Sequence, residues 1–142
     1  MSIIGRSIDT ITGMYDFAAD GGAVGTINLQ IPIPVNSIFM EAGSYTNVAL
    51  TSGTSMATVS VDAFDMSTNP PTANVAFFQA AVLVSNAQYL KGGLKSFCDP
   101  SAPIFSGVPS FPISVAISIA VEPLLTGQLL FWFRVLTYEV SM

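Results

Sequence analysis

The sequence contains no histidine, a single cysteine and few charged residues. Without histidine the chain lacks the commonest general base and the commonest ligand for zinc and copper. Cys98 cannot form an intrachain disulfide, and a nucleophilic cysteine needs a base beside it, so we interpret Cys98 as a buried or half-buried free thiol. We therefore predict that the protein is not an enzyme, with no catalytic residues, no cofactor and no metal ion.

Charge of both signs is scarce. Charged residues make up 9% of the 142 residues and hydrophobic residues 51%, whereas about 25% is charged in typical soluble domains. The net charge is −5 and only four residues are Lys or Arg, but nucleic acids and anionic membranes are bound by clustered Lys and Arg. Because a lone domain needs charged surface to stay dispersed, we expect assembly with other protein chains, and no nucleic-acid or membrane partner.

Long uninterrupted hydrophobic runs are also missing. The first residues lack the charged start and the apolar core of a signal peptide. Between Pro100 and Phe133 the only charge is Glu122, but five prolines interrupt this stretch. A membrane-spanning helix needs about 20 continuous apolar residues, so we interpret the stretch as strands.

The sequence does contain apolar and polar residues that alternate with a period of two, which is the pattern of β-strands. In residues 24–33 the alternation ends at Pro32 and Pro34, which lack an N–H, so this strand should end there or lie at a sheet edge. Residues 75–84 fit a strand better than a helix because Val, Phe and Leu dominate them. We predict strands over residues 24–33, 37–46, 56–64, 75–84, 113–121 and 128–140.

Turn-forming residues separate these segments. The polar turn at residues 51–55 predicts that strands 37–46 and 56–64 form a hairpin or meander. Residues 1–23 are expected to be an N-terminal arm or a first strand, and residues 99–112 a proline-rich loop. The sequence thus predicts an all-β protein with one domain over residues 1–142, an antiparallel β-sandwich that is jelly-roll-like or a small barrel.

The predicted strand 128–140 is apolar on both of its faces. A strand of this kind is buried on both sides, and without helices to cover the outer face we expect another subunit to cover it. For its aromatic residues, core packing is the commoner use, intersubunit packing is the next, and a ligand pocket or sugar platform is a further alternative. The candidate interface residues are Leu130, Phe131, Trp132, Phe133, Leu136 and Tyr138.

Two pairs of acidic residues come nearest to a metal site. Asp16 and Asp20, and likewise Asp62 and Asp65, could contribute oxygen ligands to a calcium ion. Neither pair matches an EF-hand loop. We interpret all four as solvated acids in turns.

Three segments carry a family resemblance: GGAVGTINLQIPIPVNSI (21–38), TSGTSMATVSVDAF (51–64) and LLTGQLLFWFRVLTY (124–138). Their pattern resembles small virion proteins of tailed bacteriophages, of the capsid decoration or head-fibre type. The resemblance implies a β-sandwich, often trimeric, that docks on the capsid lattice or on another virion part and performs no catalysis.

The resulting hypothesis is a structural component of a bacteriophage virion. We expect a homo-oligomer, preferably a trimer, that binds the major capsid protein or another virion protein and is assembled in the host cytoplasm. The alternative is a small carbohydrate- or receptor-binding β domain, such as a tail-fibre or lectin-like module. Trp132 or Tyr89 facing solvent beside polar loop residues would favour that alternative.

Overall fold

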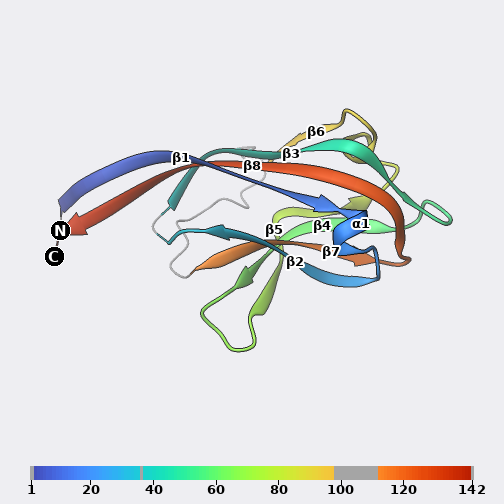
Figure 1. Ribbon diagram of the computed structural model, residues 1–142, viewed down its shortest axis with the longest axis horizontal. Coiled ribbons are helices and arrows are strands. Elements are labelled where there is room, and N and C mark those ends of the chain that lie inside the picture. The colour runs from blue at the N-terminus through green and yellow to red at the C-terminus, as the bar shows by residue number, and fades with distance from the viewer. Residues whose placement is uncertain (1, 36, 98–111, 142) are drawn as a thin grey trace.

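The computed structural model describes residues 2–35, 37–97 and 112–141, with the backbone alone at residues 2–6, 37 and 138–141. Two antiparallel four-stranded sheets pack face to face and form the two layers seen in Figure 1. The β1 sheet contains, in spatial order, β1 (Ser2–Asp16), β8 (Leu124–Ser141), β3 (Ser37–Ser52) and β6 (Leu94–Ser96). The β2 sheet contains β2 (Gly25–Ile33), β7 (Ile113–Ala120), β4 (Thr58–Asp65) and β5 (Thr72–Leu83).

The strand order is that of a jelly roll. Strand β1 pairs with β8, β2 with β7, β3 with β6 and β4 with β5, as in one long antiparallel ribbon that is rolled into two layers. The prediction of a jelly-roll-like β-sandwich is confirmed. The alternative of a small barrel is wrong, because the two sheets remain separate and each has open edges.

The predicted hairpin between residues 37–46 and 56–64 is wrong. Strand β3 lies in the β1 sheet and pairs with β8 and β6, whereas β4 lies in the β2 sheet between β7 and β5. The Gly/Ser turn reverses the chain, but it carries the chain from one layer to the other. A polar turn in the sequence marks a reversal and does not show which strand becomes the hydrogen-bonding partner.

Several single-strand predictions are confirmed. Strand β2 lies at a sheet edge, as Pro32 and Pro34 required, and residues 75–84 fall largely within the strand β5. Strand β1 is followed by the short helix α1 (Phe17–Asp20), and the 3₁₀ turn η1 (Ala87–Tyr89) precedes β6. Cys98 and nearly all of the predicted loop 99–112 lie outside the described residues.

The core lies between the two sheets and is rich in phenylalanine. The rings of Phe78 and Phe133 have centroids 5.1 Å apart, and Phe39 meets Phe78 edge-on at 5.8 Å. Such offset and T-shaped pairs add to the free energy gained by burial. From β4 and β7, the branched residues Val59, Val61 and Ile117, each 0% exposed, close the core from the β2 sheet.

Strands β1 and β8 extend past the rest of the β1 sheet. Strand β3 starts at Ser37, opposite Thr137, so residues 2–6 and 138–141 are paired only with each other. They form a two-stranded ribbon that carries both chain termini away from the sandwich (Figure 1). A two-stranded ribbon by itself has marginal stability in water.

Candidate functional site

The outer face of the β2 sheet is covered by its own chain. The small face of β7 is buried, with Ala116 at 0% and Ser114 at 3% exposure. Ser114 donates a hydrogen bond of 2.7 Å to Asn28 Oδ1 on the neighbouring strand β2. The sequence indicated that this small face lets another group pack close, and the edge strands of the same sheet supply that group.

Asp62 lies at the centre of this covered face. Its side chain is 0% exposed and accepts hydrogen bonds from Ser60 Oγ and the Ala76 amide, both at 2.8 Å, and from Ser118 Oγ. A buried carboxylate is tolerated when such donors surround it. The interpretation of Asp62 as a solvated acid in a turn is therefore wrong. The available signal was the alternation of Ser60 and Asp62 with Val59 and Val61.

The outer face of the β1 sheet is different, because apolar side chains remain accessible there. Facing residues form rows across β1, β8 and β3. One apolar row contains Ile8, Leu136 and Ile38. Another row contains Met14, Leu130 and Tyr45. The exposed fraction is 52% for Ile8, 41% for Met14 and 42% for Ile38. We call this surface the open face; its outward side chains are Ile8, Thr10, Thr12, Met14, Ile38, Glu41, Tyr45, Leu130, Trp132, Arg134 and Leu136.

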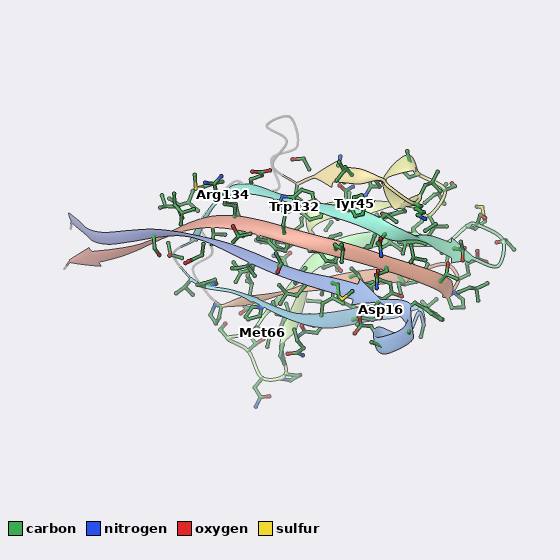
Figure 2. All side chains as sticks on the ribbon, turned by 45° about the horizontal axis from the view of Figure 1, so that its top comes forward. Asp16, Tyr45, Met66, Trp132 and Arg134 are labelled. Carbon is green, nitrogen blue, oxygen red and sulfur yellow. The ribbon has the colours of Figure 1, made fainter. Side chains whose placement is uncertain are left out.

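Trp132 lies in the middle of the open face. It pairs with Thr12 on one side and with Gly43 on the other, and a Cβ atom at Gly43 would come within 2.6 Å of the indole Cζ2. Glycine at this position therefore lets the indole ring lie across β3. Figure 2 shows Trp132 on β8 near Tyr45 on β3, with Arg134 further along β8.

A hollow opens beside the indole ring. Its volume is about 490 Å³, and its lining is mostly apolar. Half-buried Trp132 and Tyr45 contribute the aromatic part, and Met14 and Leu130 contribute flexible aliphatic surface. The lining residues are Thr12, Gly13, Met14, Tyr45, Leu130, Phe131 and Trp132.

The structure divides the candidate interface residues between two faces of β8. Phe131 and Phe133 point into the core and are 1% and 0% exposed, so they are committed to their own chain and cannot reach a partner. Leu130, at 37% exposure, lies on the open face together with half-buried Trp132 and Leu136. Tyr138 pairs with Arg6 in the ribbon, where the backbone alone is described.

One charged row crosses the open face. Arg134 lies opposite Thr10 on β1 and opposite Glu41 on β3. This row places one positive and one negative residue on the face, so its formal charge is zero. A face with this composition favours protein contacts over nucleic acid, which is bound through clustered positive charge.

Glu122 joins two loops at the far end of the sandwich. Its carboxylate accepts hydrogen bonds from Ser52 Oγ at 2.5 Å, from the Met56 amide at 3.0 Å, and from the Thr54 amide and hydroxyl. The Ser52 hydrogen bond, followed by those of Met56 and Thr54, lowers the pKa of Glu122 to about 2. All these donors belong to the β3–β4 connection, so Glu122 has a structural role.

The remaining acidic candidates also have structural partners. Asp16 caps α1 by accepting from the Ala18 amide at 3.3 Å, and Asp20 accepts from the Asp16 amide at 2.9 Å. Asp65 accepts from the amide and hydroxyl of Ser67 at 2.9 and 2.6 Å. Within the described ranges, no group of three or more His, Cys, Asp or Glu side chains could hold a metal ion.

The two buried tyrosines face inward. Burial, assisted by Asp20 and Asp16, raises the pKa of Tyr15 to about 12, and its hydroxyl donates to the Gly21 carbonyl at 2.6 Å. Burial likewise raises the pKa of Tyr89, whose hydroxyl donates to the Val59 carbonyl at 3.0 Å. Tyr89 is 0% exposed and is not part of any surface for a ligand.

Solved structures with this fold include chains from two bacteriophage capsids. A chain from the capsid of Ralstonia phage GP4 has a TM-score of 0.62 and 18% identity, covering 99% of this chain and 88% of that chain. A chain from the acid-stable capsid of Helicobacter pylori bacteriophage KHP30 has a TM-score of 0.58 and 14% identity, covering 96% and 94%. At these identities the likeness is one of fold.

No protein-family model and no curated protein matches the sequence. In the part of the chain that the structure describes, no helix is long and apolar enough to cross a membrane.

Proposed function

We propose that this protein is a structural component of a bacteriophage virion, a capsid decoration or auxiliary protein or a head-fibre protein. The observation that carries the proposal is the likeness of fold, over nearly the whole chain, to chains from two phage capsids. The jelly roll also occurs in lectins, so the fold alone does not select the role. The open face supplies the second argument.

The open face suits burial against another protein. It presents apolar and aromatic side chains and one neutral charged row, and interfaces are enriched in Trp, Tyr and Met and depleted in Lys and Glu. Among the described residues, the edge strands of the β2 sheet supply hydrogen-bonding partners to its outer face, whereas no described strand covers the apolar outer face of the β1 sheet. We propose that the open face of β8 contacts a neighbouring copy or another virion protein, and that the preferred oligomer is a trimer.

Neutral hydroxyl pairs support the same role. Ser7 and Thr137, Thr26 and Ser118, and Thr51 and Thr126 form cross-strand hydrogen bonds of 2.9, 2.7 and 2.6 Å at the surface. Such groups tolerate burial in an interface better than charged side chains, because less solvation is lost.

The location of the protein tests the virion role. Purified particles of the phage that encodes the chain should contain it in many copies, and a cryo-EM reconstruction should show the sandwich at repeated lattice positions. Its absence from purified particles by mass spectrometry would overturn the proposal.

The open face is tested by replacing Leu130 with Asp. A charge at the centre of an apolar contact should dissociate the oligomer in sedimentation velocity while circular dichroism stays unchanged. Val75 on β5 is 63% exposed and lies away from the open face, so Val75→Asp is the matched control and should leave the oligomer intact. Equal assembly of both variants would exclude the open face as the contact.

A carbohydrate- or receptor-binding module is the second candidate. The half-exposed pair Trp132 and Tyr45 beside a hollow of about 490 Å³ favours it, because aromatic faces can pack on sugar rings. However, the pair lies on strands rather than among polar loop residues, and Tyr89 is buried. Ligand-induced quenching of Trp132 fluorescence on a glycan panel, lost in Tyr45→Leu, would support this candidate.

A further inference from the structure

The four edges of the two sheets are protected to very different degrees. Edge strands carry unpaired backbone groups, and proteins protect them with prolines, bulges or short strands. Strand β2 has Pro32 and an irregular register between Asn28 and Ile31. Strand β5 has two register shifts against β4, with a positive φ at Ala76, and β6 is only three residues long.

Strand β1 has none of these protections over most of its length. It contains 15 residues and neither proline nor lysine, and its register with β8 is unbroken from Gly5 to Asp16. Ser7, Ile8 and Thr10 are exposed, and only β8 pairs with β1 among the described residues. An exposed edge of this length is a template for a further strand.

We propose that β1 pairs antiparallel with β1 of a second copy of this chain. The two strands would be related by a twofold axis between the two Ile8 residues, so that Ile8 lies opposite Ile8 and Ser7 of each copy lies opposite Asp9 of the other. This contact is distinct from the open face and does not depend on the virion role. In a trimeric assembly it would join one trimer to the next.

The projecting ribbon supports this partner and this register. Residues 2–6 are paired only with residues 138–141. With the axis at Ile8, residues 2–6 of one copy run beside residues 10–14 of the other, where β1 belongs to the full sheet. Each two-stranded ribbon thereby gains a third strand from its partner, which is what a marginally stable ribbon requires.

The residues along β1 fit the same register. With the axis at Ile8, the 52% exposed Ile8 side chains of the two copies face each other, and Asp9 of each copy faces Ser7 of the other. Like charges at facing positions destabilise an antiparallel pair, and this register keeps the two Asp9 carboxylates from facing each other.

Cysteine cross-linking tests the pairing and the register together. In a Cys98→Ser background, one sample would carry Ser7→Cys and another Asp9→Cys, each in the full chain. Facing residues of antiparallel strands have Cα atoms about 4.5–5.5 Å apart, within the range of a disulfide. A mixture of the two variants should form a covalent dimer on oxidation, whereas either variant alone should not.

The matched control lies on another edge. Leu94 on β6 is 67% exposed, and Leu94→Cys should give no covalent dimer under the same conditions. Cross-linking of Leu94→Cys with none in the mixture of the two β1 variants would overturn the proposal.

A second pair of variants keeps the test independent of disulfide formation. Ser7→Lys with Asp9→Lys places like charges at facing positions of the proposed contact without changing an open-face residue, and the dissociation constant should rise at least tenfold by sedimentation equilibrium. Val75→Lys with Ala80→Lys on β5 is the control and should leave the constant unchanged.

The outcomes separate this contact from the open face. If Leu130→Asp dissociates the oligomer while the β1 variants do not weaken association, the pairing of β1 is wrong and the proposed role of the open face stands. If the β1 variants alone weaken association, the pairing is supported whatever the protein binds in a virion.

Discussion

At the scale of single residues, a small side chain and a buried acceptor decide how side chains pack on the outer face of each sheet. Gly43 leaves room for the indole of Trp132, and Asp62 provides a single acceptor for three donors from β4, β5 and β7. Neither role can be recognised from the residue type alone, because each depends on a neighbour that is distant in the sequence.

The residue Gly43 gives the first prediction. In Gly43→Ala the added Cβ would lie 2.6 Å from the indole of Trp132 and would also meet the Lys95 carbonyl oxygen. Overpacking of this kind costs about 1–3 kcal/mol, which urea unfolding followed by Trp132 fluorescence should show. Gly53→Ala is the control, since nothing lies within 4 Å of its added Cβ. Equal stability of the two variants would contradict the packing of Trp132 on Gly43.

Asp62 gives the second prediction. Asp62→Ala would leave the Ser60 and Ser118 hydroxyls and the Ala76 amide without their acceptor in a buried site. Buried unsatisfied donors make the expected loss about 2–4 kcal/mol in the free energy of unfolding. Asp62→Asn retains the shape and one oxygen acceptor and should lose less, by thermal and urea unfolding. A larger loss in Asn than in Ala would show that the three donors are not what Asp62 stabilises.

At the scale of elements, the two sheets differ in how their outer faces and edges are completed. The β2 sheet covers its face with its bulged edge strands β2 and β5, whereas the β1 sheet leaves an apolar face open and one long edge unprotected. The loops at the far end are held together by Glu122. Contacts with other chains are therefore expected on one sheet only.

The Glu122 loop contact gives a pH-dependent prediction. The pKa of Glu122 is lowered from 4.5 to about 2 by hydrogen bonds that the unfolded chain lacks. Its stabilising contribution is thus fully present above about pH 4.5 and is lost as the pH falls toward 2.

Glu122→Gln does not titrate, so the difference in urea midpoint between the native chain and this variant measures the contribution. The difference should be largest at pH 7 and should shrink steadily below pH 4.5. A difference that stays constant down to pH 2 would contradict the role of the carboxylate.

At the scale of the whole molecule, the scarcity of charge determines how assembly should respond to salt. The open face carries one positive and one negative residue, Arg134 and Glu41, among apolar neighbours. Burial of apolar area is screened little by salt, whereas contacts between exposed charges weaken with it.

Association through the open face should therefore change less than about threefold between 50 and 500 mM NaCl, because few charge pairs are involved. Sedimentation equilibrium of the full chain measures it, and Ser7→Lys with Asp9→Lys removes the contribution of the β1 edge. A tenfold weakening at high salt would show that charge pairs drive the assembly.

Part of the fold could be predicted because it depends on local pattern. The period-two alternation of residues 113–121 specifies a strand with a branched face and a small face, and β7 has both. Pro32 removes a backbone donor, so its strand should end there or lie at an edge, and β2 lies at an edge. The scarcity of charged residues and the lack of histidine narrowed the expected classes of function from the sequence alone.

Other features were decided by tertiary structure, because they depend on which distant strands pair. The sequence did not show that Phe131 and Phe133 are core residues and that Trp132 is a surface residue. That assignment depends on which face of β8 meets the β2 sheet in the jelly roll. Asp62 became a buried acceptor only because β5 and β7 bring Ala76 and Ser118 to it. The sequence by itself determined strands, their faces and a surface with little charge, since alternation and composition are local properties. Tertiary structure decided the pairing of strands between layers, the open face and the unprotected edge, since these are set by the free energy of packing the whole chain.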